Sequence, residues 1–393
     1  MLETGNWKLV AGSWQLVCPP PNPLPSEWEG EKSRYALYPP PMRSYRLGDP
    51  ELDARIRRLA EDAVAAGGDG HEDADLISEM IVTVLRLHRD RADRGDLKLV
   101  NTALKEMRYA FLVFSQYRHI PKVTVFGSAR TRPGDPNYEL AASFAEHMAD
   151  VRRWMVITGA GPGTMEAANK GAGGASSFGV NIRLPFEATA NPYVDDARLI
   201  NFKYFFTRKL VFVKESDAFA LFPGGFGTQD ETYELLTLTQ TGKTALHPIV
   251  LLEAPGTGYW DRWIEFVDET LVHQGMITPD DLALFTHATD IAAAADAIAN
   301  FYANYHSLRY VDDRLVLRLR KVPDPALIER LNDEFGDILA SGRIEAIGAT
   351  PAEIADDDLT ALPRLSLHFD RKSHGRLRVM VDALNDLVLR DGV

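Results

Sequence analysis

A glycine-rich decapeptide at residues 222–231, Phe-Pro-Gly-Gly-Phe-Gly-Thr-Gln-Asp-Glu, constrains the fold of this chain more than any other stretch. It follows a short apolar run, residues 217–221, that is typical of a buried strand, and the spacing of apolar residues over 231–240 predicts a helix. Glycine lets a ligand approach the backbone closely, and the free N–H groups at the start of a helix favour an anion. The stretch therefore predicts a phosphate-binding turn between a strand and a helix.

Thr228 and Glu231 within this stretch allow two interpretations. Thr-x-x-Glu is the pattern of a capping box, in which Thr228 is the N-cap and Glu231 only accepts a hydrogen bond from its N–H. From these two residues alone the cap is the simpler explanation. A cap does not require the Pro-Gly-Gly-x-Gly run before it, so the whole string favours a ligand site that includes Glu231.

Strands and helices alternate from residue 122 to about residue 304, which is the sign of a parallel sheet with crossover helices. We expect a Rossmann-like, doubly wound α/β domain with strands at residues 122–126, 154–158, 178–184, 199–202, 217–221 and 247–252. Ligands of such sheets bind beyond the carboxyl ends of the strands. The glycine-containing turns at 127–130, 159–166 and 222–231 all fall at such ends, so they predict one shared pocket.

The two ends of the chain differ from this central part in their sequence patterns. We therefore expect three domains, at residues 1–118, 119–304 and 305–393. Residues 1–49 are rich in Trp and Pro and predict an extended arm, and helical patterns follow at 52–66, 73–88 and 97–117. After residue 304 the pattern predicts strands at 314–321, 343–347 and 364–369 and helices at 325–339 and 376–389. That order indicates a small α+β region of split βαβ type.

Composition excludes several classes of function. A net charge of −13 argues against general affinity for nucleic acid or an anionic membrane. With Cys18 as the only cysteine no intrachain disulfide can form, and with no signal peptide and no apolar run of membrane-spanning length we expect a soluble, cytoplasmic protein. The ten histidines show no metal-ligand spacing, so neither a metal nor another cofactor is expected.

The turn at residues 159–163, Gly-Ala-Gly-Pro-Gly, is similar at first to a dinucleotide fingerprint. The third glycine position of that fingerprint is Thr164 here, and no acidic residue ends the next strand at the expected spacing. A nicotinamide dinucleotide site is therefore not expected.

Arg208 and Lys209 before the motif strand, together with Pro-Gly-Gly-x-Gly-Thr-x-x-Glu after it, closely resemble the LOG (LONELY GUY) family. Members of this family cleave nucleoside 5′-monophosphates to a free base and ribose 5-phosphate. Some have been labelled lysine decarboxylases, which the residues of this chain do not support. The resemblance covers about residues 119–304. It is to the larger members, which carry terminal extensions and a Thr-Gly-x-Gly-Pro-Gly-x-Met-Glu-Ala-Ala turn.

The resemblance implies that Arg208 and Glu231 form the catalytic pair. It implies a substrate-binding set made of Gly127, Ser128, Gly161, Gly163, Thr164, Glu166, Lys209, Gly224, Gly225, Gly227 and Thr228. Two of these assignments have a plain structural alternative. Arg208 and Lys209 could form a solvated helix face, and Glu166 could be a first-turn acid that interacts with the helix dipole.

The resemblance further implies a hydrolase for AMP or a cytokinin-type riboside monophosphate. The turn would hold the 5′-phosphate, and Glu231 would activate water and stabilise the developing sugar cation, with Arg208 orienting Glu231 or the phosphate. Two alternatives stay open: a broad purine and pyrimidine nucleotide nucleosidase, and a non-catalytic carrier of a nucleotide or of molybdenum cofactor. The resemblance also implies a homodimer or higher homo-oligomer that pairs through the helices around the motif, where Leu235, Leu236 and Leu238 supply more apolar surface than one sheet face needs.

Overall fold

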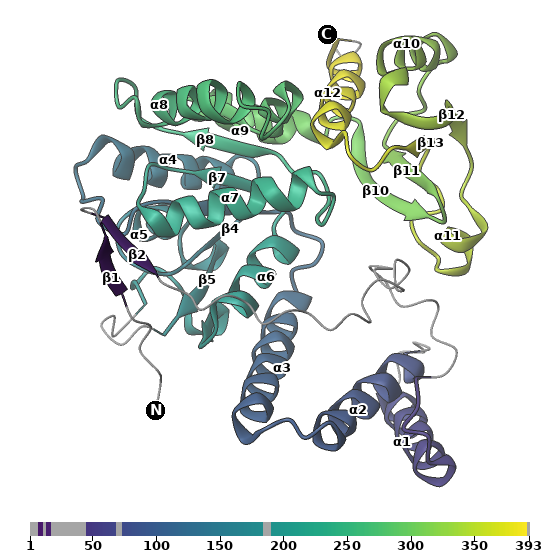
Figure 1. The fold of residues 1–393 in the computed structure, drawn as a ribbon. Coiled ribbons are helices and arrows are strands. Elements are labelled where there is room, and N and C mark those ends of the chain that lie inside the picture. Colours follow the sequence, from purple (N-terminus) through teal and green to yellow (C-terminus); the bar gives the residue numbers. More distant parts are fainter. Residues whose placement is uncertain (1–6, 11–12, 17–44, 68–72, 184–189, 391–393) are drawn as a thin grey trace. The chain divides into compact units, whose positions relative to one another are not determined.

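The computed structural model (Figure 1) describes residues 7–10, 13–16, 45–67, 73–183 and 190–390. The chain forms two compact units, residues 1–97 and residues 98–393.

The first unit holds a two-stranded antiparallel ribbon and two helices. The ribbon consists of β1 (Trp7–Val10) and β2 (Ser13–Leu16), and the helices are α1 (Pro50–Gly67) and α2 (Ala74–Arg89), which pack against each other. Arg86 and Arg89 of α2 donate hydrogen bonds to the carbonyls of Arg46 and Leu47. Helix α3 (Arg94–Ser115) leads into the second unit. All three predicted helices are confirmed, whereas most of the predicted arm lies outside the described residues.

The second unit is built on a seven-stranded parallel sheet with the order β6-β5-β4-β3-β7-β8-β9. Its strands are β3 (Lys122–Phe126), β4 (Met155–Thr158), β5 (Ser177–Ile182), β6 (Leu199–Phe202), β7 (Ala218–Leu221), β8 (Ile249–Leu252) and β9 (Thr286–Ala288). The four central strands are buried along their whole length, which explains their continuous apolar runs. The predicted Rossmann-like fold is confirmed. The short strand β9 was not predicted.

Helices cover both faces of this sheet (Figure 1), as its doubly wound topology requires. One face packs against α3, α6 (Phe205–Glu215), α7 (Phe226–Gln240) and α8 (Tyr259–Phe266), and the other packs against α4 (Pro136–Asp150), α5 (Thr164–Ala172) and α9 (Ile291–Phe301). The apolar pattern of residues 260–272 predicts one helix, which the structure divides: α8 ends at Phe266, and a π-helical turn, Val267–Val272, continues it.

The C-terminal region forms a four-stranded antiparallel sheet with the order β10-β11-β13-β12. Its elements are β10 (Tyr305–Val311), β11 (Arg314–Leu319), α10 (Pro325–Phe335), β12 (Leu339–Ile347), the short helix α11 (Pro351–Ala355), β13 (Arg364–Phe369) and α12 (His374–Arg390). Both β11 and β12 pair antiparallel with β13, so β11 and β12 run parallel with β13 between them. The predicted split βαβ unit is confirmed, and β10 is an edge strand that was not predicted.

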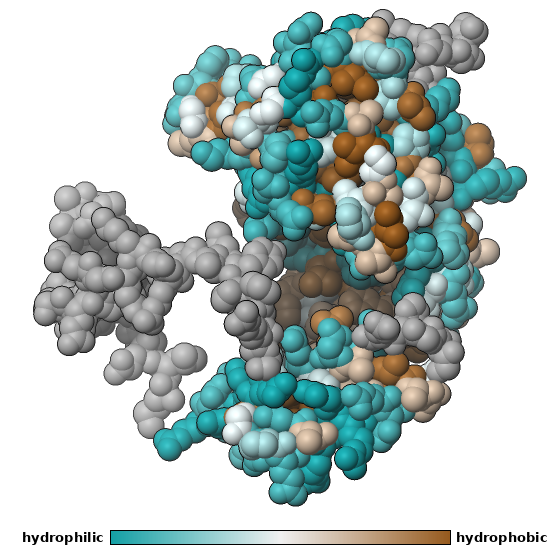
Figure 2. Space-filling model, turned by 90° about the vertical axis from the view of Figure 1, so that its right-hand side faces the viewer, coloured by the Kyte–Doolittle hydropathy of each residue, from teal (hydrophilic) through white to brown (hydrophobic). Residues whose placement is uncertain are grey.

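A buried ion cluster holds the loop between β12 and β13. The Glu353 carboxylate accepts hydrogen bonds from Arg318 at 2.9 Å and from Arg364 at 3.0 Å. Burial opposes ionisation of Glu353, but these bonds and two from Thr350 lower its pKa to about 2. On the outer surface of this region, in the upper part of Figure 2, hydrophilic and hydrophobic residues are interspersed.

Candidate active site

Three turns meet at the carboxyl ends of the neighbouring strands β4, β3 and β7, as predicted. They are bonded to one another through their backbones. The Ser128 N–H after β3 donates to the Pro223 carbonyl after β7 at 3.1 Å, and the Thr164 N–H at the start of α5 donates to the Ser128 carbonyl at 3.0 Å. The structure thus brings together the turn residues of the predicted substrate-binding set.

Close backbone contacts explain why glycine is needed in these turns. Gly163 has a φ of +72°, in the left-handed region, and a Cβ there would lie 2.3 Å from the Ser128 carbonyl oxygen. A Cβ on Gly127 would lie 2.6 Å from the Thr164 side chain, which fills the space beside this glycine. The carbonyl of Gly161 accepts a hydrogen bond from the Asn191 amide at 3.1 Å. The turns after β3 and β4 therefore fit together only because positions 127 and 163 carry no side chain.

The prediction that Thr228 is the N-cap of the motif helix was wrong. Helix α7 begins at Phe226 and its N-cap is Gly225, so Thr228 is the third helical residue. The chain enters the helix at the glycines themselves, with Gly225 in an extended conformation just before Phe226. Glu231 then lies too far along the helix to close a capping box. That interpretation of Glu231 is excluded.

The motif turn itself is open at some positions and filled at others. Gly225 and Gly227 have no atom within 4 Å of where a side chain would begin, and Phe226 between them is 96% exposed. The Thr228 side chain is buried against Gly224, with its Oγ1 2.0 Å from the place of a Cβ. The first N–H groups of α7 therefore lie on a turn where the space beside Gly225 and Gly227 is open.

Arg208 lies in α6 with only 9% of its surface exposed, so it is not part of a solvated helix face. Its Nε donates to the Val180 carbonyl of β5 at 2.8 Å. Its Nη2 lies 2.4 Å from where a Cβ on Gly159 would be. Arg208 thus packs directly under the turn after β4, and no residue larger than glycine fits at position 159 without moving it.

Glu231 of α7 is also buried, with 9% exposed, and its charge is matched by cations of α6. The Lys209 Nζ lies 3.6 Å from the Glu231 carboxylate, 3.0 Å from Asp230 and 2.8 Å from Glu234. Burial raises the pKa of Glu231 to about 7, although Lys209 and Arg208 act in the opposite direction. A carboxyl group that titrates near neutrality in a glycine-lined site is suited to proton transfer and to cation stabilisation.

Glu166 in the first turn of α5 accepts a hydrogen bond from the hydroxyl of Tyr138 in α4, at 3.2 Å. Burial, with the nearby Glu166 charge, raises the pKa of Tyr138 to about 12. Through this bond Glu166 takes part in the packing of α5 against α4. A sugar-binding role for it stays a prediction.

Two residues that support the motif turn were not predicted. The Tyr259 hydroxyl at the start of α8 donates to the Gly224 carbonyl at 2.6 Å, and the Gln229 amide donates to the Tyr259 hydroxyl oxygen at 2.6 Å. Gln229 stands inside the motif and could have been noticed there. Tyr259 lies far beyond the motif in sequence and belongs to no recognised pattern, so only the fold reveals it.

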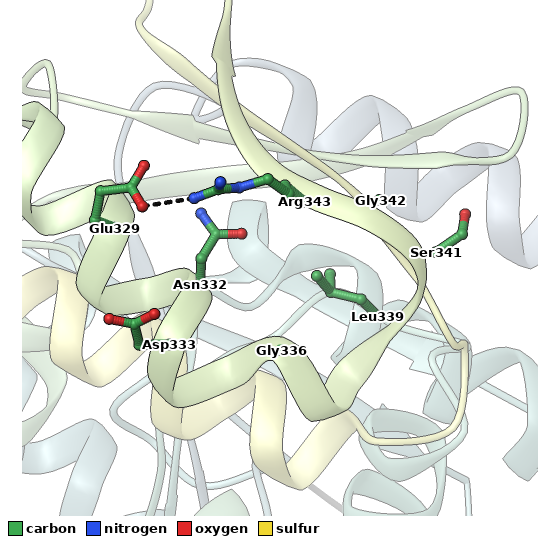
Figure 3. Close-up of a pocket in the computed structure, with 8 residues that line it drawn as sticks. All are labelled: Glu329, Asn332, Asp333, Gly336, Leu339, Ser341, Gly342 and Arg343. Atoms are coloured by element: carbon green, nitrogen blue, oxygen red, sulfur yellow. Dashed lines mark hydrogen bonds and ion pairs between the residues drawn. The ribbon is translucent and has the colours of Figure 1, made fainter.

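Two further groups of polar side chains lie outside the three turns. Among the described residues, Glu253, Asp261 and His287 stand close enough to hold a metal ion, but both Glu253 oxygens already accept N–H groups at the start of α8. A shallow hollow of about 490 Å³ lies between α10 and β12 (Figure 3). There Arg343 pairs with Glu329 at 2.6 Å, and the hollow contains none of the predicted site residues.

The sheet and its three glycine-lined turns define an α/β protein of the Rossmann-like class with a candidate site at the carboxyl edge of the sheet. Comparison with known proteins is consistent with this assignment. A family model described as "possible lysine decarboxylase" matches residues 148–298. The "cytokinin riboside 5'-monophosphate phosphoribohydrolase" of Rhodococcoides fascians is 31% identical over 195 residues, which are 48% of this chain and 95% of that protein. The chain therefore belongs to the LOG family.

Other similarities are more limited. The "probable cytokinin riboside 5'-monophosphate phosphoribohydrolase LOGL9" of Oryza sativa subsp. japonica is 40% identical over 83 residues, 21% of this chain. That match spans only 35% of the length of the rice protein. A solved structure of the molybdenum cofactor carrier protein from Chlamydomonas reinhardtii is 23% identical, covers 46% of this chain and 97% of its own, and has a TM-score of 0.33.

Proposed function

We propose that this chain hydrolyses the N-glycosidic bond of a nucleoside 5′-monophosphate, with AMP or a cytokinin-type riboside monophosphate as the first candidates. The observation that carries the proposal is the buried Glu231 carboxyl with Arg208 and Lys209 nearby, on the helix that starts at the motif turn. Membership of the LOG family supports the same activity.

In the proposed reaction the 5′-phosphate binds at the start of α7, next to Gly225 and Gly227, where helix N–H groups favour an anion. Ionised Glu231 faces the ribose. It takes a proton from the attacking water and stabilises the positive charge that develops on the sugar. The water oxygen forms a bond to the anomeric carbon, and the bond to the base breaks with its electron pair going to the base. The base takes up a proton from solvent, and Glu231 returns to solvent the proton that it took from the water, so one water is consumed. The products are the free base and ribose 5-phosphate.

Chromatography of the products after incubation with a panel of nucleoside monophosphates tests this function. Release of free base by the wild-type protein, and none by a folded Glu231→Gln variant, would support it. Base release from many purine and pyrimidine monophosphates at similar rates would favour the broad nucleosidase. Binding of a monophosphate without release of base would overturn the proposal in favour of a carrier.

We also propose a homodimer, on different grounds from those first considered. The argument from leucines of α7 was wrong for Leu235, which is buried in this chain's own core, and for Leu236, which packs against it. Exposed apolar side chains near the motif include Phe205, Phe206 and Leu210 of α6 and Phe226 at the start of α7. Light scattering at micromolar concentration tests this assembly, and a monomer would contradict it.

The proposed domains are residues 1–118, 119–304 and 305–393, with the chemistry confined to the second. We further propose a cytoplasmic location, in keeping with a phosphorylated substrate and a single cysteine. In the part of the chain that the structure describes, no helix is both long and apolar enough to cross a membrane.

A further inference from the structure

Tyr259 is bound to the motif turn from outside the motif. Its hydroxyl donates to the Gly224 carbonyl at 2.6 Å and accepts from the Gln229 amide at 2.6 Å. A tyrosine hydroxyl carries one proton, and the amide N–H of Gln229 already occupies a lone pair of its oxygen. The proton is therefore directed at Gly224.

The start of α8 holds Tyr259 in place. The backbone N–H groups of Tyr259 and Trp260 donate to the two oxygens of Glu253, at 2.7 and 3.0 Å. The Tyr259 ring packs edge-on against Trp260, with 4.9 Å between ring centroids, and Trp260 is fully buried. The hydroxyl is thus fixed by the core and not by the turn that it contacts.

We propose that Tyr259 is a positioning residue that presets the motif turn for the 5′-phosphate; this inference rests on the proposed function. The peptide group between Gly224 and Gly225 is planar and trans, so its C=O and N–H point in opposite directions. Because the carbonyl is held toward Tyr259, the Gly225 N–H is held away from it, at the N-cap of α7. Two adjacent glycines give this peptide little stiffness of its own, so the tyrosine determines its orientation.

The decisive variant is Tyr259→Phe, which removes one oxygen and keeps the ring contact with Trp260. Tyr302→Phe is a matched control, because the Tyr302 hydroxyl donates to a backbone carbonyl at the same distance, 2.6 Å, at Asp217. Asp217 precedes β7, at the opposite end of that strand from Gly224. Both variants lose one tyrosine-to-carbonyl bond, but only one loses it at the motif turn.

We expect Tyr259→Phe to raise the KM for AMP about tenfold, because the turn loses one good hydrogen bond. The kcat should stay within about twofold of wild type. The inhibition constant of adenosine, which lacks the phosphate, should change less than about twofold. Tyr302→Phe should leave the KM for AMP unchanged. Gln229→Leu frees the hydroxyl to rotate and should raise the KM in the same direction, by a smaller factor.

Circular dichroism and thermal unfolding show whether each variant is folded. If Tyr259→Phe does not fold, Gln229→Leu serves as the test. A KM for AMP within twofold of wild type in the folded variant, or an equal loss of affinity for AMP and adenosine, would overturn the role of Tyr259. If the wild-type protein releases no base from any monophosphate, the proposed function fails separately. Calorimetric titration with AMP then tests the positioning role of Tyr259. Weaker AMP binding by Tyr259→Phe, but not by Tyr302→Phe, supports this role, and unchanged binding by Tyr259→Phe refutes it.

Discussion

Replacing Glu231 by Gln should remove activity and at the same time stabilise the protein above neutral pH. Burial raises the pKa of Glu231 from 4.5 to about 7, so the folded protein binds this proton more tightly than the unfolded chain does. Between those two pH values the folded state carries more protons, and stability falls as the pH rises. At pH 8.5 the full penalty of ionising the buried carboxyl, about 3 kcal/mol, is present. Glutamine has nearly the same shape and does not ionise.

Thermal unfolding at pH 5 and pH 8.5 measures this effect. At pH 5 the carboxyl is protonated in the folded wild type but largely ionised in the unfolded chain, so the variant should be more stable by only about 0.8 kcal/mol. At pH 8.5 the variant should unfold roughly 6 °C higher, at roughly 2 °C per kcal/mol for a unit of this size. Turnover should fall on the order of 10²-fold or more, because a charge that stabilises the transition state is lost.

Glu234→Gln is the matched control for that experiment. Glu234 lies on the same helix and pairs with the same Lys209 at 2.8 Å, but its side chain is 30% exposed. Its loss should change stability by less than about 1 kcal/mol. If Glu231→Gln unfolded at the wild-type temperature at pH 8.5, Glu231 would not be a buried acid with a raised pKa. If it were folded and turned over AMP at a near-normal rate, the catalytic assignment would be refuted.

Arg208, the ionisation of Glu231 and the buried carboxylate of Glu353 each give a further prediction. Arg208→Ala should lower turnover of AMP at least about 100-fold and weaken its binding, measured by steady-state kinetics with circular dichroism as the check on folding; a mere change in stability would contradict its role. The kcat/KM of the wild type should fall about tenfold per pH unit below about 7, since ionised Glu231 is the active form, and a flat pH profile would contradict this. Glu353→Gln should destabilise the C-terminal region by about 3 kcal/mol at pH 7, because Arg318 and Arg364 lose their buried carboxylate. That contribution is complete above about pH 4.5 and disappears as the pH falls through about 2, so equal unfolding profiles of wild type and variant at pH 7 would refute it.

Much of the fold could be predicted from the sequence, because the buried parallel strands are short apolar runs between glycines. The strands at 122–126, 199–202 and 364–369 were predicted with their observed ends. Strand β9 was missed because Thr286–Ala288 is only three residues long and has no apolar pattern. The apolar pattern of residues 291–305 predicts one helix, whereas α9 ends at Phe301 and β10 begins at Tyr305, and for this reason β10 was missed.

The candidate site was predictable as far as its residues belong to local motifs. The strand-end positions of the glycine turns follow from the alternation of strands and helices, and the structure does bring these turns together. The start of α7 at Phe226 could not be predicted, since Thr228 is an equally acceptable N-cap by sequence. The burial of Arg208 under Gly159 and the bond from Tyr259 to Gly224 depend on tertiary packing between distant segments.

The strand order has a consequence for how the chain is made. Strand β7 lies between β3 and β8, but 91 residues, 127–217, separate it from β3 along the chain. At the usual speed of synthesis, about 5–20 residues per second, one edge of the apolar strand β3 therefore waits about 5–20 s for its second neighbour. The unpaired N–H and C=O groups of such an open edge invite pairing with other chains. A nascent chain that ends before Ala218 should thus be the form of this protein most prone to aggregation and most in need of a chaperone.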